Sequence, residues 1–389
     1  MKTILIRTSR VILALGFGSL LFLLLSYAGS KSKGPLDDMA VLLNKNIATI
    51  EKNIVDTRES RSASLKWFDE YRRDKNKLNK PEVMMLGAYD DQTVESYESI
   101  ISLEQQLTTE LPIISLYTAW GSKRTQVFPV LRAQAISDLG SIPLVTWEPW
   151  LDDFDAQFFS QMAEESNKNK NGLKAIAEGR FDEYIDKWAT DAKNFGAPFF
   201  LRLGHEMNDP YRYPWGPQNN KPEDFIAAWK HVRDRFHKIG AENAVWIWSP
   251  HPGYSFEEFY PGDEYVDWIG TTTLNYGTVA NWSQWWSFDE TFAKFYAGMA
   301  RYKKPMMLTE FGSLSVGGDR ADWFTKAFES LKVRFPEVKA VVFFHVSNDN
   351  TTTYKSLDWS FINDEKVMAA LESSIDGLKK RYGLESKPK

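Results

Sequence analysis

Two stretches of the sequence each place a glutamate at the end of a run of mostly apolar residues. FFLRLGHE ends at Glu206, and PMMLTE ends at Glu310. Burying a carboxylate at such a position costs free energy unless partner groups hold the charge. Hydrolysis of a glycosidic bond needs two carboxyl groups, one that donates a proton and one that is ionised and attacks the sugar or activates water. Glu206 and Glu310 are therefore candidate catalytic residues.

Tryptophan is frequent in this chain, with 15 Trp among 389 residues. An indole face stacks well on a sugar ring, although most tryptophans pack in protein cores. An isolated glutamate is usually a helix cap or a solvated loop charge, but two glutamates that end apolar runs, together with nearby indoles, favour a carbohydrate site. Further candidates near the ends of such runs are Trp147, His205, Trp248, Tyr276 and His345.

From Pro81 onward, short apolar runs alternate with longer segments of helical periodicity. The short runs predict eight strands, at 83–90, 112–120, 142–150, 198–206, 244–250, 266–275, 304–313 and 338–347. The longer segments predict helices at 93–107, 128–140, 180–196, 222–240, 288–302, 320–335 and 363–383. The strand runs do not alternate cleanly with polar residues, which is typical of parallel strands covered on both faces.

Eight strands separated by helices over roughly 300 residues predict an α/β fold of the (β/α)8 TIM-barrel type. The alternative is a doubly wound open sheet, but no Gly-rich nucleotide-binding loop follows any predicted strand. Active sites of such barrels gather at the carboxyl ends of the strands. Glu206 ends the fourth predicted strand and Glu310 the seventh, so the two carboxylates are expected to face each other across the barrel.

The N-terminus carries a basic head followed by an apolar run. Lys2, Arg7 and Arg10 precede residues 11–29, which contain no charged side chain. Residues 1–29 are therefore predicted to be a signal peptide or an N-terminal transmembrane anchor. The length of the run favours the uncleaved anchor, with the rest of the chain outside the cytoplasm. Cleavage after the small-x-small pattern at 26–28 is the alternative and gives a secreted or periplasmic protein.

Residues 30–80 are predicted to form a linker and an amphipathic helix, and residues 81–389 the catalytic domain. SKSKGP at 30–35 is a polar segment with a Gly-Pro break. Beyond it, apolar residues recur at spacings of four and three, which is one face of a helix. These residues are Leu43, Ile47, Ile50 and Ile54.

Composition and charge exclude several classes of protein. The net charge is −5 and the pI about 5.7, which argues against a nucleic-acid partner. The chain has no cysteine, so it has neither disulfides nor cysteine metal ligands. HEMND at 205–209 does not fit the H-E-x-x-H zinc motif. No cofactor and no metal are predicted.

Several segments of the sequence together resemble those of glycoside hydrolase family 26. LRLGHEMNDPYRYPWG at 201–216 is similar to the family's acid/base segment, and KPMMLTEFGS at 304–313 resembles its nucleophile strand. WIWSP, VDWIGTTTLNYG and LDWSF follow in the family's usual order, and the resemblance spans about residues 81–383. It implies a retaining, endo-acting enzyme on a (β/α)8 barrel that cleaves β-linked polysaccharide, with a monomeric catalytic domain.

The same resemblance implies roles for individual residues. Glu206 would be the acid/base and Glu310 the nucleophile. His205 would bond a sugar hydroxyl or the nucleophile, Tyr276 would bond the nucleophile, and Trp215 would form a sugar platform. Arg202 and Asn208 would support these groups. For His205, Trp215 and Tyr276 a purely structural role in the core is the alternative.

Two departures from the family's pattern bear on the substrate. Asp209 stands where the family usually has Gly, and HVSNDN at 345–350 replaces the Trp-containing end of strand eight common in mannanases. YPWG at 213–216 resembles members that cleave mixed-linkage β-1,3-1,4-glucan, which is favoured over β-1,4-mannan. A different class stays open: a non-hydrolytic protein that binds polysaccharide, or assembles envelope polysaccharide, on a glycosidase barrel.

Overall fold

The computed structural model describes Lys45 and residues 59–94, 96–155, 168–281, 283–351 and 356–384. The predicted signal or anchor at 1–29 and the apolar stripe at 43–54 lie outside these residues. Within the described part of the chain, no helix is long and apolar enough to cross a membrane.

Eight parallel strands close into a barrel in which every strand pairs with its neighbours in chain order and β8 pairs with β1. The predicted (β/α)8 fold and all eight strands are thereby confirmed. The strands are β1 Met85–Asp90, β2 Ile113–Ala119, β3 Ile142–Glu148, β4 Phe199–Leu203, β5 Ala244–Trp248, β6 Trp268–Asn275, β7 Met306–Ser313 and β8 Val338–His345.

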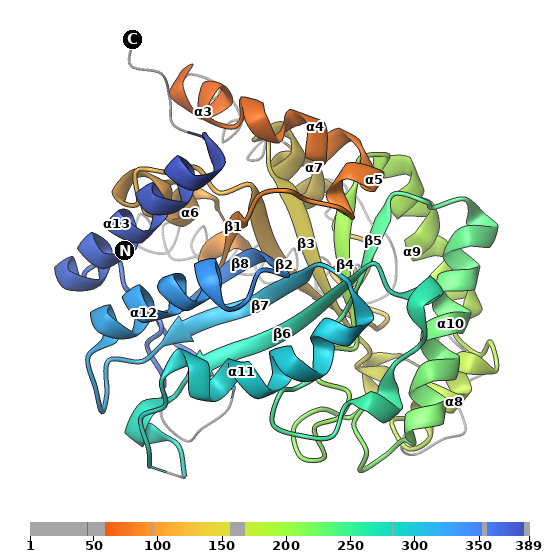
Figure 1. Cartoon of the computed structure of the whole chain (residues 1–389). Helices are drawn as coiled ribbons and strands as arrows, with labels where there is room; N and C mark the ends of the chain where they lie inside the picture. The colour runs from red at the N-terminus through yellow and green to blue at the C-terminus, as the bar shows by residue number, and fades with distance from the viewer. Residues whose placement is uncertain are drawn as a thin grey trace, which may run out of the picture. The chain divides into compact units, whose positions relative to one another are not determined.

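Helices surround the barrel (Figure 1). They are α6 Glu98–Gln106, α7 Val130–Asp138, α8 Gly172–Ala177, α9 Asp182–Phe195, α10 Pro222–Ile239, α11 Phe288–Met299, α12 Arg320–Val333 and α13 Glu365–Tyr382. Short 3₁₀ turns join them at Asp91–Val94, Leu151–Asp153, Glu257–Phe259, Asp263–Tyr265, Gly277–Val279 and Ala300–Tyr302. Helix α10 begins with Pro222 and is capped after Ile239 by Gly240, whose φ of 80° is the left-handed conformation that glycine adopts at low cost.

Short helices cover the amino-terminal end of the barrel (Figure 1). They are α3 Glu59–Ser64, a 3₁₀ turn at Lys66–Phe68, α4 Asp69–Arg73 and α5 Lys75–Leu78. Their buried residues Leu65, Phe68, Tyr71 and Leu78 share one apolar cluster with the barrel interior, which includes Ile113, Phe200 and Met307. The described residues from Leu65 to Leu78 therefore pack with the barrel, although they precede residue 81.

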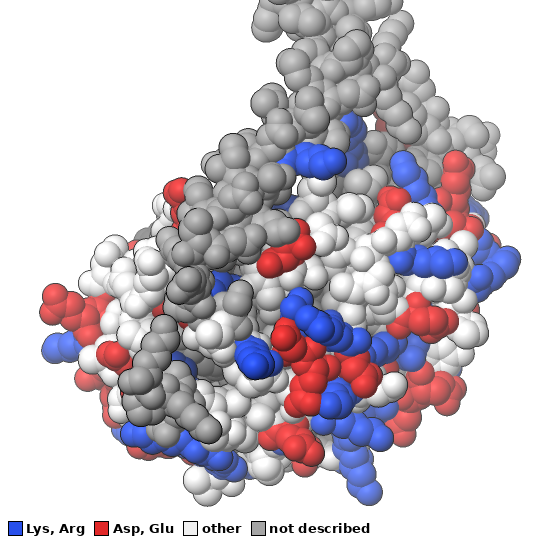
Figure 2. Space-filling model, turned by 90° about the horizontal axis from the view of Figure 1, so that it is seen from above, with Lys and Arg blue, Asp and Glu red and all other residues white. Residues whose placement is uncertain are grey.

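The face that carries these short helices has a mixed charge pattern. Figure 2 shows Lys and Arg interspersed with Asp and Glu among its described residues, without a patch of one sign. A nucleic-acid surface requires clustered positive charge. This face of the described chain therefore offers no such surface, in agreement with the net charge.

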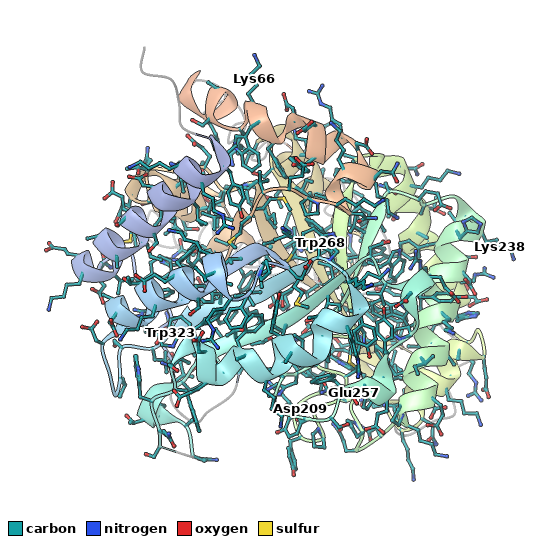
Figure 3. The ribbon with its side chains drawn as sticks, in the orientation of Figure 1. Lys66, Asp209, Lys238, Glu257, Trp268 and Trp323 are labelled. Atoms are coloured by element: carbon teal, nitrogen blue, oxygen red, sulfur yellow. The ribbon has the colours of Figure 1, made fainter. Side chains whose placement is uncertain are left out.

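The opposite end of the barrel carries the loops that follow the strands. In Figure 3, Asp209 and Glu257 lie at this end, while Lys66 lies at the end closed by the short helices. Trp268 lies inside the barrel, where its indole packs against Phe200. The carboxyl ends of the strands thus form the mouth of the barrel, at the end opposite the short helices and beyond a filled interior.

Two predicted sugar-binding tryptophans are instead core residues. On β5, Val245 and Ile247 face the barrel interior, so the alternating side chains turn Trp248 toward the helices. Trp147 likewise leaves the barrel: its indole is fully buried and stacks on Trp188 of α9 with 4.1 Å between ring centroids. The prediction for both residues was wrong because nearness to a strand end does not say which face a side chain occupies.

Replacing Trp147 by alanine should therefore weaken the fold rather than sugar binding. The cavity between β3 and α9 is expected to lower the free energy of unfolding by about 3–5 kcal/mol. Denaturant unfolding measures this loss, and KM measured well below the melting temperature should stay close to the wild-type value. A tenfold rise in KM with unchanged stability would instead show that Trp147 contributes to sugar binding.

Candidate active site

Glu206 lies on a tight turn directly after β4. Gly204 and Glu206 both adopt positive φ, 50° and 53° respectively. For a glutamate this backbone conformation is uncommon and costs on the order of 1–3 kcal/mol. The turn is held because the Glu206 amide donates to the Ser249 carbonyl at 2.8 Å and the Gly204 amide donates to the Trp147 carbonyl at 3.0 Å. These bonds tie β4 to both neighbouring strands and fix the direction of the Glu206 side chain.

The Glu206 carboxylate is almost completely buried, with 1% of the residue exposed. The Arg212 guanidinium donates to its Oε2 at 3.4 Å. Its Oε1 has no hydrogen-bond partner among the described residues. A buried carboxyl oxygen without a partner is rare in folded proteins and points to a role that needs a free oxygen.

A β-bulge turns Glu310 into the barrel. Thr271 on β6 pairs with Leu308 on β7, and Thr272 pairs with Glu310, so Thr309 has no partner on β6. Before the bulge Met307 faces the interior, and after it Phe311 packs on the helix side. The extra residue therefore changes which positions face inward, as bulges near active sites commonly do.

Arg202 and Tyr117 hold one oxygen of the Glu310 carboxylate. Arg202 donates from Nη1 to Oε1 at 2.6 Å, and the Tyr117 hydroxyl donates to the same oxygen at 2.7 Å. Arg202 also donates to the hydroxyls of Ser249 and Thr272. The bonds from Arg202 and Tyr117 to Glu310 both go to Oε1. Arg202 thus lies where the family resemblance put a supporting residue.

Tyr117 was not predicted from the sequence. It belongs to β2, whose run Ile113–Ala119 is apolar apart from a serine, a tyrosine and a threonine, and a single tyrosine in a strand carries no functional signal. Burial, with the negative charge of Glu310, raises the pKa of Tyr117 well above its ordinary value. Its hydroxyl therefore keeps its proton near neutral pH and can donate the hydrogen bond to Glu310.

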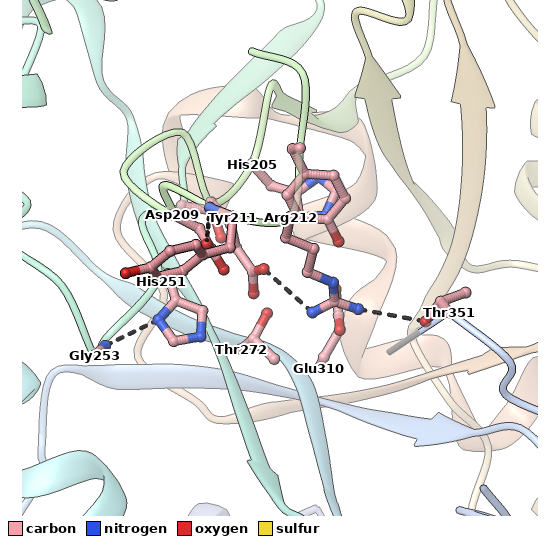
Figure 4. Close-up of polar contacts among 12 residues, drawn as sticks. His205, Asp209, Tyr211, Arg212, His251, Gly253, Thr272, Glu310 and Thr351 are labelled. Carbon is pink, nitrogen blue, oxygen red and sulfur yellow. Dashed lines mark hydrogen bonds and ion pairs between the residues drawn. The ribbon is translucent and has the colours of Figure 1, made fainter. Parts of the chain in front are cut away.

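Arg212 reaches into the mouth of the barrel from the segment after Glu206 and was also missed. It bridges Glu206 and the Thr351 hydroxyl, each at 3.4 Å (Figure 4). Its guanidinium lies over the Tyr213 ring, 5.2 Å from the centroid. Burial opposes its charge, but Tyr213 and the carboxylates of Glu206 and Glu310 raise its pKa. A permanent cation therefore lies between the two candidate catalytic groups.

Trp215 is not a free sugar platform. The residue is only 3% exposed, and its indole is stacked on Tyr213 with 4.6 Å between centroids and 11° between ring planes. Its Nε1 donates to the His205 carbonyl at 2.7 Å. Trp215 therefore supports Tyr213, and the ring next to the mouth is that of Tyr213. The prediction failed because the sequence does not show that one aromatic ring covers the other.

His205 is buried and forms a hydrogen bond to the Tyr213 hydroxyl through Nε2 at 3.0 Å. Its Nδ1 has no partner among the described residues. Burial, with the nearby charges of Arg202 and Arg212, holds the pKa of His205 well below its ordinary value. The imidazole is therefore neutral near pH 7, which suits orientation of neighbouring groups rather than proton donation.

Three other predicted binding residues make structural contacts. The Asn208 amide nitrogen donates to the His251 carbonyl at 2.9 Å, and its oxygen accepts from the His251 amide at 2.7 Å, so Asn208 anchors the loop after β5. His345 pairs with Asp90 at 2.9 Å, between β8 and β1. Tyr276 contacts Trp359 edge-on at 4.9 Å. The described contact to Glu310 comes from Tyr117, and a bond from Tyr276 remains a prediction.

Glu148, at the end of β3, is a third carboxyl group near the site. Burial raises its pKa to about 7, and the negative charge of Glu310 adds to this effect. A bond from the Trp150 indole and the charge of Arg202 act in the opposite direction. Glu148 is therefore about half protonated at neutral pH.

This raised pKa predicts a pH-dependent stability. Between the ordinary pKa of a glutamate and pH 7, folded Glu148 binds a proton that the unfolded state has lost, so its contribution to the free energy of unfolding should fall as the pH rises through this range. Glu148→Gln removes the titrating group and should give a shallower fall. Denaturant unfolding of both proteins at several pH values between 4.5 and 8 measures the difference, and parallel profiles would contradict the assignment.

One cluster among the described residues has the spacing of a cation site. Glu206, Asp209 and His251 each offer a ligand atom, and these atoms lie within 4.8 Å of one another. The His251 Nδ1 already accepts the Gly253 amide at 3.0 Å (Figure 4). Arg212, 3.4 Å from Glu206, opposes a further positive charge there. The cluster could therefore hold a metal ion only against this repulsion.

The fold and the two buried glutamates define a barrel of the glycosidase type. The chain belongs to glycosyl hydrolase family 26, whose family model matches residues 156–313. Endoglucanase H of Acetivibrio thermocellus is 32% identical over 293 residues, which is 73% of this chain and 29% of that protein. Beta-1,3-xylanase TXYA of a Vibrio species is 27% identical over 124 residues, covering 29% of this chain and 26% of that one. The chain thus spans less than a third of these relatives.

Solved structures of the family share the fold. A Bacillus subtilis mannanase covers 76% of this chain and 87% of its own, with a TM-score of 0.54 and 18% identity. A Bacteroides ovatus β-mannanase covers 82% of this chain and 93% of its own, with a TM-score of 0.55 and 16% identity. At such low identity these likenesses establish the barrel alone.

Proposed function

We propose that the protein is a retaining, endo-acting glycoside hydrolase of β-linked polysaccharides. The observation that carries this proposal is the convergence of Glu206 from β4 and Glu310 from β7 on one buried site, where Arg212 interacts electrostatically with both. The two glutamates differ in the way a double displacement needs. Arg202 and Tyr117 hold Glu310, whereas Glu206 keeps one oxygen without a partner among the described residues.

The proposed reaction has two steps. In the first, Oε2 of Glu310 attacks the anomeric carbon, the bond from that carbon to the glycosidic oxygen breaks, and Glu206 gives this oxygen its proton. In the second, Glu206 takes a proton from water, and the water oxygen attacks the anomeric carbon and releases Glu310. The bonds from Arg202 and Tyr117 fix the attacking carboxylate in one orientation.

The proposed polymer is a β-glucan of mixed linkage, with β-1,4-mannan as the alternative. The YPWG segment and the altered end of β8 support glucan, and so does the name of the endoglucanase that is 32% identical. Initial rates on purified mixed-linkage glucan and on mannan, at equal mass concentration, test this choice. A clear preference for mannan would overturn the choice of sugar and leave the reaction unchanged.

The second candidate is a protein that binds polysaccharide without cleaving it. Arg212 favours it, because its guanidinium bonds Glu206 and Thr351 and so occupies one oxygen of the group that would have to donate the proton. Size-exclusion analysis of β-glucan after incubation separates the two functions. Shortened chains support the hydrolase, whereas binding with unchanged chain length would support the second candidate.

We propose that the protein is exported, either anchored by residues 1–29 or released after their cleavage. The support is the uncharged run behind three basic residues at the N-terminus. Cell fractionation should recover full-length protein in the membrane pellet. A soluble form that begins near Gly29 would instead identify a secreted enzyme.

A further inference from the structure

Arg212 has far more hydrogen-bonding capacity than its contacts use. A guanidinium carries five N–H donors. Among the described residues, two contacts are made, to Glu206 and Thr351, and both are 3.4 Å long. Charge-assisted bonds between Arg and a carboxylate are normally about 2.7–2.9 Å and often bidentate. Arg212 is therefore in a position to exchange these weak contacts for a better anionic partner.

Arg212 lies where such an anionic partner would belong to the substrate. Its side chain is 25% exposed, whereas those of Arg202 and Glu206 are each 1% exposed. In Figure 4 the guanidinium lies beside Glu310 and extends toward Thr351, across the mouth. Stacking on Tyr213 supports the guanidinium from one side. A sugar that reaches Glu206 and Glu310 must therefore come into contact with Arg212.

The reaction itself weakens the ion pair between Arg212 and Glu206. Before the bond breaks, Glu206 must carry the proton that it donates, so it is then neutral. Glu310 remains ionised, and the Arg202 contact at 2.6 Å balances its charge. Two further carboxyl groups lie near, Glu148 and Asp209, and a ligand atom of Asp209 lies within 4.8 Å of one of Glu206. Protonation of Glu206 thus weakens the contact that Arg212 makes to a carboxylate among the described residues.

We infer that Arg212 selects β-glycans that carry an anionic group, with a carboxylate as the best fit, on a sugar next to the cleaved bond. This inference rests on the proposed function and narrows its substrate class. The planar fork of Arg212 matches a carboxylate in two parallel bonds, which a neutral hydroxymethyl group cannot offer. A sulfate or phosphate half-ester also carries negative charge. Comparison of kcat/KM on carboxylated and on sulfated glucan distinguishes the two kinds of substituent.

The test uses one polymer in two forms. A mixed-linkage β-glucan is compared with the same glucan after partial oxidation of its C6 hydroxymethyl groups to carboxylates, and a sulfated preparation forms a third arm. For the full-length protein, kcat/KM should be higher on the carboxylated glucan than on its parent. In Arg212→Gln this ratio should fall about 10- to 100-fold, the effect of losing a charge-assisted hydrogen-bonded pair.

Two further variants make the result specific. Arg212→Lys keeps the charge but loses the fork, so it should retain part of the preference and discriminate less between carboxylate and sulfate. Arg73→Gln is the matched control, because Arg73 is a surface arginine of α4 with 70% of its side chain exposed. It should keep the wild-type ratio. Melting curves of all variants establish that they are folded.

A binding measurement separates this inference from the proposed hydrolysis. Calorimetry on Glu310→Gln compares a neutral cello-oligosaccharide with one of equal length that contains glucuronate. Preference for the acidic sugar, weakened by salt and lost in the Glu310→Gln, Arg212→Gln double variant, supports the role of Arg212 even if no polymer is cleaved. Two results would overturn the inference. One is cleavage of neutral glucan with no preference for acidic glucan, and the other is an equal rise of kcat/KM on both glucans in Arg212→Gln.

Discussion

Glu310→Ala should abolish hydrolysis of β-glycan down to the background rate. Without the carboxylate no atom can attack the anomeric carbon from the side opposite the leaving group, so the glycosyl-enzyme cannot form. Added azide should restore part of the turnover on an aryl glycoside, because the small anion fits the vacated space. Its attack from the position of Glu310 should give the α-glycosyl azide, which proton NMR identifies.

Glu310→Ala is also expected to lower the stability of the fold, so its activity must be compared with that of other folded variants. Removing Glu310 leaves the buried Arg202 without its ionic partner, a change that typically costs about 3–5 kcal/mol. Glu310→Gln keeps the shape of the side chain and a hydrogen-bonding oxygen, and should lose activity equally. Glu329→Ala, at an exposed position on α12, is the control that should keep full activity. Near-normal activity in a folded Glu310→Ala protein would remove Glu310 from the nucleophile role.

Glu206→Ala should lower kcat by about 10²- to 10⁴-fold on polysaccharide, the usual contribution of a general acid. The loss in the first step should shrink for aryl glycosides whose leaving group departs without a proton. The second step also needs Glu206, as a base, so the glycosyl-enzyme should accumulate and azide should accelerate its breakdown. The expected product is the β-glycosyl azide, the opposite anomer from the one made by Glu310→Ala.

The backbone at position 206 requires a second variant for this test. Its φ of 53° is unfavourable for any side chain, so Glu206→Ala keeps the strain but loses the contact to Arg212. Glu206→Gln retains the size of the side chain and should show the same dependence on the leaving group. Equal losses of kcat/KM, which reports the first step, on polysaccharide and on an activated aryl glycoside, in both variants, would contradict the role of Glu206 as the proton donor.

The pattern of apolar runs predicted most of the fold. Eight apolar runs predicted eight strands because strands buried on both faces need continuous apolar sequence. Because these runs are mostly apolar along their length, they do not reveal which of their side chains face the barrel interior. Trp147 and Trp248 stand at strand ends, but the phase of alternation turns both toward the helices. Glu310 faces inward because of a bulge, which no residue pattern in KPMMLTEFGS announces.

The candidate site was predictable where a motif fixed it and not where partners are distant in sequence. Glu206, Glu310 and Arg202 were identified from two short segments. Tyr117 reaches Glu310 across 193 positions of the chain, and only the closed barrel brings them together. Arg212 belongs to the segment at 201–216, but an arginine in a loop is usually solvated and gives no functional signal. The contacts to Glu206 and Thr351 give it meaning.

The anomeric form of the first product tests the central claim most directly. Proton NMR spectra are recorded from the first seconds after the enzyme is mixed with a β-glucan oligosaccharide, before mutarotation equilibrates the new reducing end. If Glu310 attacks and water then replaces it with help from Glu206, the β-anomer appears first and the α-anomer grows in later. Initial formation of the α-anomer would show a single displacement by water and would contradict the double displacement proposed for this site.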